Sequence, residues 1–335
     1  MTNPAIVEIL RGDRVESAHR GAGAVVDALG RLVFGFGDIE RPTFPRSAVK
    51  AFQALPLVES GAADRLGFSP QQLALACASH SGEAEHVAGA AAILAKGGAG
   101  VEALCCGTHW PLSADAAHAL ARSGAAPSAL HNNCSGKHAG FLCLAAHEGW
   151  RLEDYVEPGH PVQEAGRAAI EAMTGEKLDE SRRAIDGCSI PTYAVSLQGL
   201  ARGFAKFASG QGISRERAEA ASRIRAAVVA NPFFVAGSGR FDTRWMELFG
   251  ARSFTKTGAE GVFCAALPEA GLGIAVKAED GASRAAEVMI AALIARFGGF
   301  DEADLARARP FLTPELKNWR GAVVGGLRPA GPLAG

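Results

Sequence analysis

The sequence lacks an apolar run long enough to cross a membrane. A membrane-spanning helix needs about 18 consecutive apolar residues, whereas the richest candidate, residues 87–94, is soon followed by Lys96 and two glycines. The N-terminal segment MTNPAIVEILRGDRVE also lacks the basic stretch, apolar stretch and small-residue cleavage site of a secretory signal. We therefore expect a cytoplasmic protein with no membrane partner.

An excess of one charge is also missing. The 34 lysines and arginines nearly cancel the 35 aspartates and glutamates, and no stretch concentrates one sign. A nucleic-acid binder should carry a basic face, so this composition argues against nucleic acid as a partner. A small-molecule substrate fits the balance better.

Cysteine is present in a number that does not suit a disulfide framework. Seven cysteines are scattered through 335 residues with no export signal, so reduced thiols or metal ligands are the better interpretation. Apolar residues make up 48% of the chain, enough to build one large domain or two intimate ones.

The order of the expected elements indicates an α+β fold. Strand patterns occupy residues 5–10, 15–20 and 32–36, and return at 253–257, 262–267 and 272–278 before a long apolar helix at 283–297. Helix starts lie between them, at Ser69, Ser113, Ser135, His160 and Ser214. We predict one antiparallel sheet built from both chain termini, with flanking helices.

This order also predicts the domain organisation. Residues 1–45 and 250–320 would form a sheet lobe, residues 46–249 a mainly helical lobe, and residues 325–335 a loose Gly/Pro-rich tail. The early helix at Ser47 and the late strand at Lys256 would meet at the boundary between the lobes, where ligand sites are common.

Two short motifs carry the candidate chemistry. In Ser47-Ala-Val-Lys50 the two polar side chains lie three residues apart on one helix face, and a neutral lysine amine can take the proton of a serine hydroxyl. Alone, this pattern is more often an ordinary helix start. Lys256-Thr257-Gly258 follows about two hundred residues later, and the pairing of S-x-x-K with K-T-G is the signature of serine β-lactamases and penicillin-binding proteins.

A third motif of those enzymes, S-D-N, is missing. The chain instead contains PRSAVK, ASHSGE, HNNCSGKHAG, DGCSIP and TKTGAEG, in that order. These segments resemble those of the L-asparaginase II family typified by rhizobial enzymes, and the resemblance extends to Asn318-Trp-Arg-Gly. It implies a serine β-lactamase/glutaminase-like fold, hydrolysis of L-asparagine to L-aspartate and ammonia, and a homodimer.

The resemblance also implies a catalytic set of two Ser–Lys pairs, Ser47 with Lys50 and Ser79 with Lys256. In the mechanism that we favour, Ser47 attacks the side-chain amide and Lys50 takes its proton. Ser79 with Lys256 then relays this proton to the departing ammonia, and water releases aspartate. The roles of the two serines can be exchanged, since the sequence does not order them.

The family's zinc positions correspond here to Cys134, Lys137 and Cys188, with Asp186 close by. Ligand spacing alone favours two buried thiols, because these cysteines lack the paired spacing of a structural zinc site. With the resemblance, zinc becomes the better interpretation. Its expected role is to position substrate or hold the site, since the serines carry the chemistry.

Further polar residues are weaker candidates. Substrate contacts are expected from Arg46, which could bind the α-carboxylate, and from His80, Asn133, Lys137 and Asp186. Surface, core or capping roles are about as plausible for Arg46, His80 and Asn133. His138 is a candidate for orienting the cleft, whereas His109, beside Trp110, and the vicinal pair Cys105-Cys106 are expected to pack in the core.

Three other functions stay open. A glutaminase shares the fold, and one methylene separates the two substrates, a difference worth only about 1–3 kcal/mol in an apolar pocket. A penicillin-recognising acyl hydrolase is disfavoured by the missing S-D-N and export signal. A non-catalytic zinc- or ligand-binding protein ranks last, because all four Ser–Lys residues are present.

Overall fold

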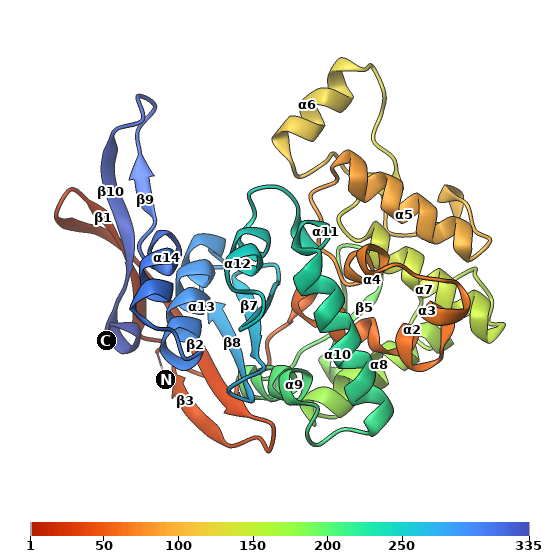
Figure 1. The fold of residues 1–335 in the computed structure, drawn as a ribbon, viewed down its shortest axis with the longest axis horizontal. Helices are drawn as coiled ribbons and strands as arrows, with labels where there is room; N and C mark the ends of the chain where they lie inside the picture. Colours follow the sequence, from red (N-terminus) through yellow and green to blue (C-terminus); the bar gives the residue numbers. More distant parts are fainter. Residues whose placement is uncertain (1, 335) are drawn as a thin grey trace.

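The computed structural model describes residues 2–334, and both ends of the chain contribute to one sheet, as predicted (Figure 1). Within these residues the sheet has eight strands, paired antiparallel in the order β6-β7-β8-β2-β1-β10-β9, with β3 paired to β2. The strands are β1 (Ala5–Arg11), β2 (Arg14–Asp27), β3 (Leu32–Phe36), β6 (Phe254–Thr257), β7 (Val262–Leu267), β8 (Leu272–Ala278), β9 (Glu315–Lys317) and β10 (Val323–Pro329).

Strand β2 joins the two ends of the chain. Its first half pairs with β1, and its second half pairs with β3 and with β8 from Gly21↔Ala278 to Asp27↔Leu272. The long β2 therefore places the C-terminal hairpin β7-β8 beside the N-terminal strands.

The helices lie around the sheet and form a lobe beside it (Figure 1). They are α1 (Lys50–Gln53), α2 (Leu55–Glu59), α3 (Ala62–Arg65), α4 (Pro70–Ala76), α5 (Ala84–Lys96), α6 (Ala114–Arg122), α7 (Ser135–Glu148), α8 (Pro161–Thr174), α9 (Leu197–Ser209), α10 (Arg215–Ala230), α11 (Pro232–Ala236), α12 (Phe241–Phe249), α13 (Ser283–Phe297) and α14 (Glu302–Leu312), with short 3₁₀ turns at η1 (Arg46–Val49), η2 (Val101–Ala103), η3 (Ala129–His131), η4 (Glu180–Arg182) and η5 (Gly331–Leu333). No helix among the described residues combines the length and apolar character that a bilayer crossing requires.

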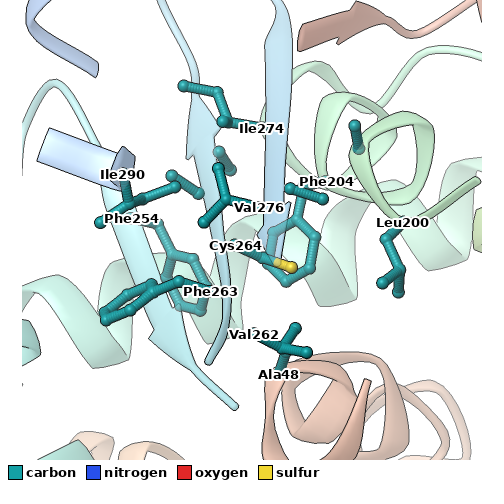
Figure 2. Close-up of a cluster of buried hydrophobic side chains, with 14 of the residues drawn as sticks. Ala48, Leu200, Phe204, Phe254, Val262, Phe263, Cys264, Ile274, Val276 and Ile290 are labelled. Atoms are coloured by element: carbon teal, nitrogen blue, oxygen red, sulfur yellow. The ribbon is translucent and has the colours of Figure 1, made fainter. Parts of the chain in front are cut away.

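The core encloses strand β7 from both sides. All six of its residues are buried, and Figure 2 shows Ile290 of α13 on one side of the strands and Leu200 of α9 on the other. Gly273 of β8 permits the close packing of α9, because a Cβ at this position would lie 1.9 Å from the carbonyl oxygen of Ala201. Close packing on both faces explains why β7 is an uninterrupted apolar run.

Local sequence signals place most helix starts correctly. The hydroxyl of Ser69 accepts a hydrogen bond from the Gln72 amide, and Ser113 and Ser214 cap α6 and α10 in the same way. The start of α7 differs by one residue, because Cys134 takes the N-cap position and Ser135 is already helical.

The strand predicted at residues 15–20 continues to Asp27, and two larger features differ from the prediction. The middle of the chain contains a small hairpin, β4 (Arg183–Ile185) with β5 (Pro191–Tyr193), inside a region expected to be helical. The prediction of a loose end at residues 325–335 is wrong for residues 325–334. Residues 325–329 pair with β1, and a Cβ on Gly325 would lie 1.9 Å from the Leu10 carbonyl oxygen. The glycines expected to loosen this end instead permit tight strand pairing.

Candidate active site

Residues from well-separated segments line one cavity of about 360 Å³. Its lining residues precede α1, follow α4, precede α6, α7 and α12, lie between β4 and β5, and end or follow β6. These residues are Arg46, Ser47, Ser79, His109, Leu112, Asn132, Asn133, Cys134, Asp186, Gly187, Cys188, Arg240, Thr257, Gly258 and Ala259. The early Ser47 motif and the late K-T-G strand therefore meet, as the sequence predicted.

Ser47 lies on a 3₁₀ turn. Residues three apart eclipse on such a turn, so Ser47 and Lys50 share one face. The residue before Ser47, Arg46, has a φ of 52°, an uncommon conformation for a residue with a side chain. The hydroxyls of Ser47 and Ser79 meet at the cavity wall, with an Oγ–Oγ distance of 3.4 Å.

Lys50 is buried behind this wall. Its Nζ donates to the Ala78 carbonyl oxygen at 2.7 Å and to Cys134 Sγ at 3.0 Å. It therefore contacts the residue preceding Ser79, and the structure contains no hydrogen bond between Lys50 and Ser47. The Ser47 motif and the K-T-G strand come together, but Lys50 forms its hydrogen bonds with Ala78 and Cys134 and not with Ser47.

Ser79 lies three residues beyond the end of α4, where the sequence placed it. Its backbone amide donates to the Val235 carbonyl oxygen at 2.9 Å, which fixes the segment. Asn133 Nδ2 donates to Ser79 Oγ at 3.2 Å. In this arrangement Ser79 accepts a hydrogen bond from Asn133 and can donate one to Ser47.

Lys256 is fully buried on β6, where its amine donates to the Thr257 carbonyl oxygen at 2.9 Å. Burial lowers the pKa of Lys256 to about 7; the Asp242 carboxylate opposes this shift, and the positive charge of Lys50 adds to it. A lysine with this pKa is partly neutral at physiological pH, as a proton acceptor must be.

Asp242 is a candidate functional residue that the sequence analysis missed. It lies in the first turn of α12 and is 1% exposed, and its Oδ1 atom has no hydrogen-bond partner within the described residues. Burial raises the pKa of Asp242, and the charge of Lys256 acts against this shift. No motif surrounds Asp242 in the sequence, so only the tertiary contact with β6 identifies it.

Cys134, Lys137 and Cys188 form a buried cluster. Lys137 Nζ lies 3.1 Å from Cys188 Sγ. The Cys188 thiol lowers the pKa of Cys134 well below its ordinary value, with the charges of Lys50 and Lys137 adding to the effect, so Cys134 favours the thiolate. Burial acts to lower the pKa of Lys137, but the interactions with Cys188 and Cys134 raise it above its ordinary value.

The donor chemistry of this cluster fits a zinc ion. Two sulfur atoms and an amine converge, and both cysteines also line the cavity, which provides an entry path. Residues 2–334 contain no group of three or more His, Cys, Asp or Glu side chains arranged for a metal. The fit therefore depends on Lys137 and Cys188 losing their protons as the ion binds, since the hydrogen bond with Cys134 and burial raise the pKa of Cys188.

Arg46 and Asp186 lie together at the cavity wall. Arg46 Nε lies 2.6 Å from Asp186 Oδ1, and the charges of Lys137 and Arg46 lower the pKa of Asp186 despite its burial. Both residues were predicted to contact substrate. In this structure the Arg46 guanidinium is already paired with a carboxylate.

Several histidines and cysteines lie elsewhere than expected. His80 is buried outside the cavity lining and lies 2.9 Å from Ser135 Oγ, and burial lowers its pKa well below the ordinary value. His138 faces the Tyr155 hydroxyl at 2.7 Å. The expectation of core packing is wrong for Cys105, which is exposed, and for His109, which lines the cavity with its Nε2 accepting from the Asn133 amide.

Comparison with known protein families shows to which class of enzyme this cavity belongs. The L-asparaginase II family matches residues 7–329, nearly the whole chain. The chain belongs to the L-asparaginase II family. It is therefore an amidohydrolase, which agrees with a cavity lined by hydroxyls beside buried amines.

Other comparisons are more distant. A β-lactamase structure from Mycobacterium bovis is 16% identical, with 86% of this chain and 94% of that chain covered and a TM-score of 0.42. A structure of Mglu in its glutamate form is also 16% identical, with 83% of this chain and 60% of that chain covered and a TM-score of 0.39. Likenesses at this level do not assign a function. No curated protein matches the chain significantly.

Proposed function

We propose that this family member hydrolyses L-asparagine to L-aspartate and ammonia through a serine ester. The observation that carries the proposal is the contact between the Ser47 and Ser79 hydroxyls at the cavity wall, with the buried amines of Lys50 and Lys256 behind them. Lys256 supplies a proton acceptor at neutral pH, because its pKa is about 7.

In the first half of the reaction, Ser47 Oγ attacks the side-chain carbonyl carbon of asparagine. The neutral Lys50 amine accepts the hydroxyl proton, and Ser79 with the neutral Lys256 amine relays that same proton to the departing nitrogen, so ammonia leaves as the ester forms. In the second half, water attacks the ester carbon, the same groups take up a proton from that water and relay it to Ser47 Oγ as the ester bond breaks, and aspartate is released. Asn133 orients Ser79 throughout through its hydrogen bond.

Zinc is part of this proposal. Cys134, Lys137 and Cys188 would hold it, and the ion would supply a fixed positive charge that positions substrate beside the serines. Every proton transfer in the proposed sequence is assigned to the Ser–Lys residues. Assembly as a homodimer remains a prediction from the family resemblance, and location in the cytoplasm remains a prediction from the sequence.

An ammonia-release assay on L-asparagine and L-glutamine, side by side, tests the activity. Wild type should release ammonia from asparagine with the higher kcat/KM, and S47A should lose at least about a thousandfold in kcat, as expected on removal of a nucleophile. A higher kcat/KM on L-glutamine than on L-asparagine would show that L-glutamine is the preferred substrate. Near-normal ammonia release by S47A would reject Ser47 as the nucleophile.

A rapid quench with mass spectrometry then distinguishes the two serines. We expect the ester on the peptide that contains Ser47, and an ester on Ser79 instead would exchange their roles. Ser81 provides a matched control, because its buried hydroxyl donates to the Ala236 carbonyl oxygen and does not line the cavity. S81A should lose stability rather than turnover.

A further inference from the structure

A second arginine besides Arg46 lines the candidate active site. Arg240 is the N-cap residue of α12, and this half-buried residue shares the cavity wall with Ser47, Ser79 and Thr257; it also lines a second cavity beside Glu287. The Arg240 backbone is held to the preceding loop, since its amide donates to the Gly237 carbonyl oxygen at 3.4 Å. The guanidinium is thus carried by a fixed helix start.

The charge of Arg240 is not neutralised by an ion pair. Arg240 takes part in none of the salt bridges within residues 2–334, whereas Arg46 is bound to Asp186 at 2.6 Å. The acidic groups whose charge it feels are Asp242 on its own helix and Glu287 on α13. Neither lies within ion-pair distance of Arg240, so its guanidinium is available to bind the carboxylate of a ligand.

The chemistry of the cavity matches an α-amino acid. A guanidinium presents parallel N–H groups that bind a carboxylate through two hydrogen bonds. Asp186 adds a negative charge to the same wall and can attract an α-ammonium group. Arg46 already donates a hydrogen bond to Asp186, so Arg240 has more N–H groups available to bind an anion.

We propose that Arg240 binds the α-carboxylate of the substrate and so restricts this enzyme to amides that carry one. The inference rests on the proposed function, because it assigns the part of L-asparagine that does not react. It replaces Arg46 in the role expected from the sequence, and leaves Arg46 to hold Asp186 beside the nucleophile.

The test compares wild type with R240A, R240K, R46A and R244A. Arg244 is the matched control, because it lies one turn further along α12 and stacks on Phe311 at 4.8 Å without lining the cavity. The assays are KM and kcat for L-asparagine, the Kd of L-aspartate by calorimetry, and inhibition by succinamate, which lacks the α-ammonium, and by 3-aminopropanamide, which lacks the α-carboxylate. Thermal melting confirms that each variant folds.

In R240A we expect KM for asparagine, Kd for aspartate and Ki for succinamate to rise about 10- to 100-fold, the range for a lost hydrogen bond to a charged group. The Ki of 3-aminopropanamide should stay unchanged, R240K should be intermediate, and R244A should match wild type. Equal weakening of all four ligands in R240A would overturn the inference, as would a carboxylate-selective loss in R46A but not in R240A. If wild type binds aspartate but releases no ammonia, the proposed function fails while the binding comparison still decides the role of Arg240.

Discussion

Replacement of Asp242 by asparagine should move the pH dependence of catalysis in a defined direction. In wild type, kcat/KM should fall on the acid side with a midpoint near the Lys256 pKa of about 7, because protonation removes the amine's lone pair. The groups that act on Lys256 are Asp242, which raises its pKa, and Lys50 and Arg240, which lower it; ionised Cys77 would raise it.

D242N removes a buried negative charge and leaves the positive charges in place. The pKa of Lys256 should therefore fall, and a nearby opposite charge is worth about one pKa unit or more. With a midpoint moved by about one unit, the neutral fraction at pH 6 rises from about a tenth to about a half, so kcat/KM at pH 6 relative to its plateau should rise about fivefold. The plateau itself should fall if Asp242 also orients the Lys256 amine.

The measurement is kcat/KM for ammonia release between pH 5 and 9 at constant ionic strength. D304N is the control, because Asp304 is also a buried carboxylate, bound to Arg252. Its acid midpoint should match wild type even if its melting temperature falls. A midpoint in D242N that is unchanged, or displaced to higher pH, would refute the assigned electrostatic coupling.

Three further substitutions test the packing and the metal cluster. G258A should reduce kcat/KM at least tenfold, because a Cβ there would lie 2.6 Å from the Pro45 carbonyl oxygen and push the K-T-G strand away from the nucleophile. G273A should destabilise the fold by about 3 kcal/mol or more, measured by urea unfolding, because its Cβ would overlap the Ala201 carbonyl oxygen. C134S should reduce the zinc content of chelator-free protein, by elemental analysis, below that of wild type.

Controls for these changes are available in the chain. Gly166 has open space around a Cβ within α8, so G166A should stabilise the helix by about 0.5–1 kcal/mol. Loss of stability in G166A similar to that in G273A would show that close packing is not the cause. Equal zinc content in C134S and wild type would place the ion elsewhere.

Much of the fold followed from local sequence patterns. The strands of β7 and β8 and the helix α13 have the predicted bounds, and Ser69, Ser113 and Ser214 cap helices through side-chain hydrogen bonds. Such signals depend on contacts between residues a few positions apart, so they can be read without tertiary structure. The hairpin β4-β5 and the ordered C-terminal strand were missed, because their stability depends on partners and packing that local propensity does not encode.

The candidate site was also predicted from the sequence only in part. Ser47, Ser79 and the two lysines were recognisable as types and spacings, and the order of the motifs indicated that they converge. The groups that each lysine contacts depend on the tertiary structure. Lys50 contacts Cys134, which is 84 positions away in the sequence, and Lys256 is buried near the Asp242 carboxylate. The sequence by itself determined the candidate reactive groups and the class of enzyme. Their charge states, and the absence of an ion pair at the Arg240 guanidinium, could be seen only in the folded structure. Both depend on burial and on charges that are distant in the sequence.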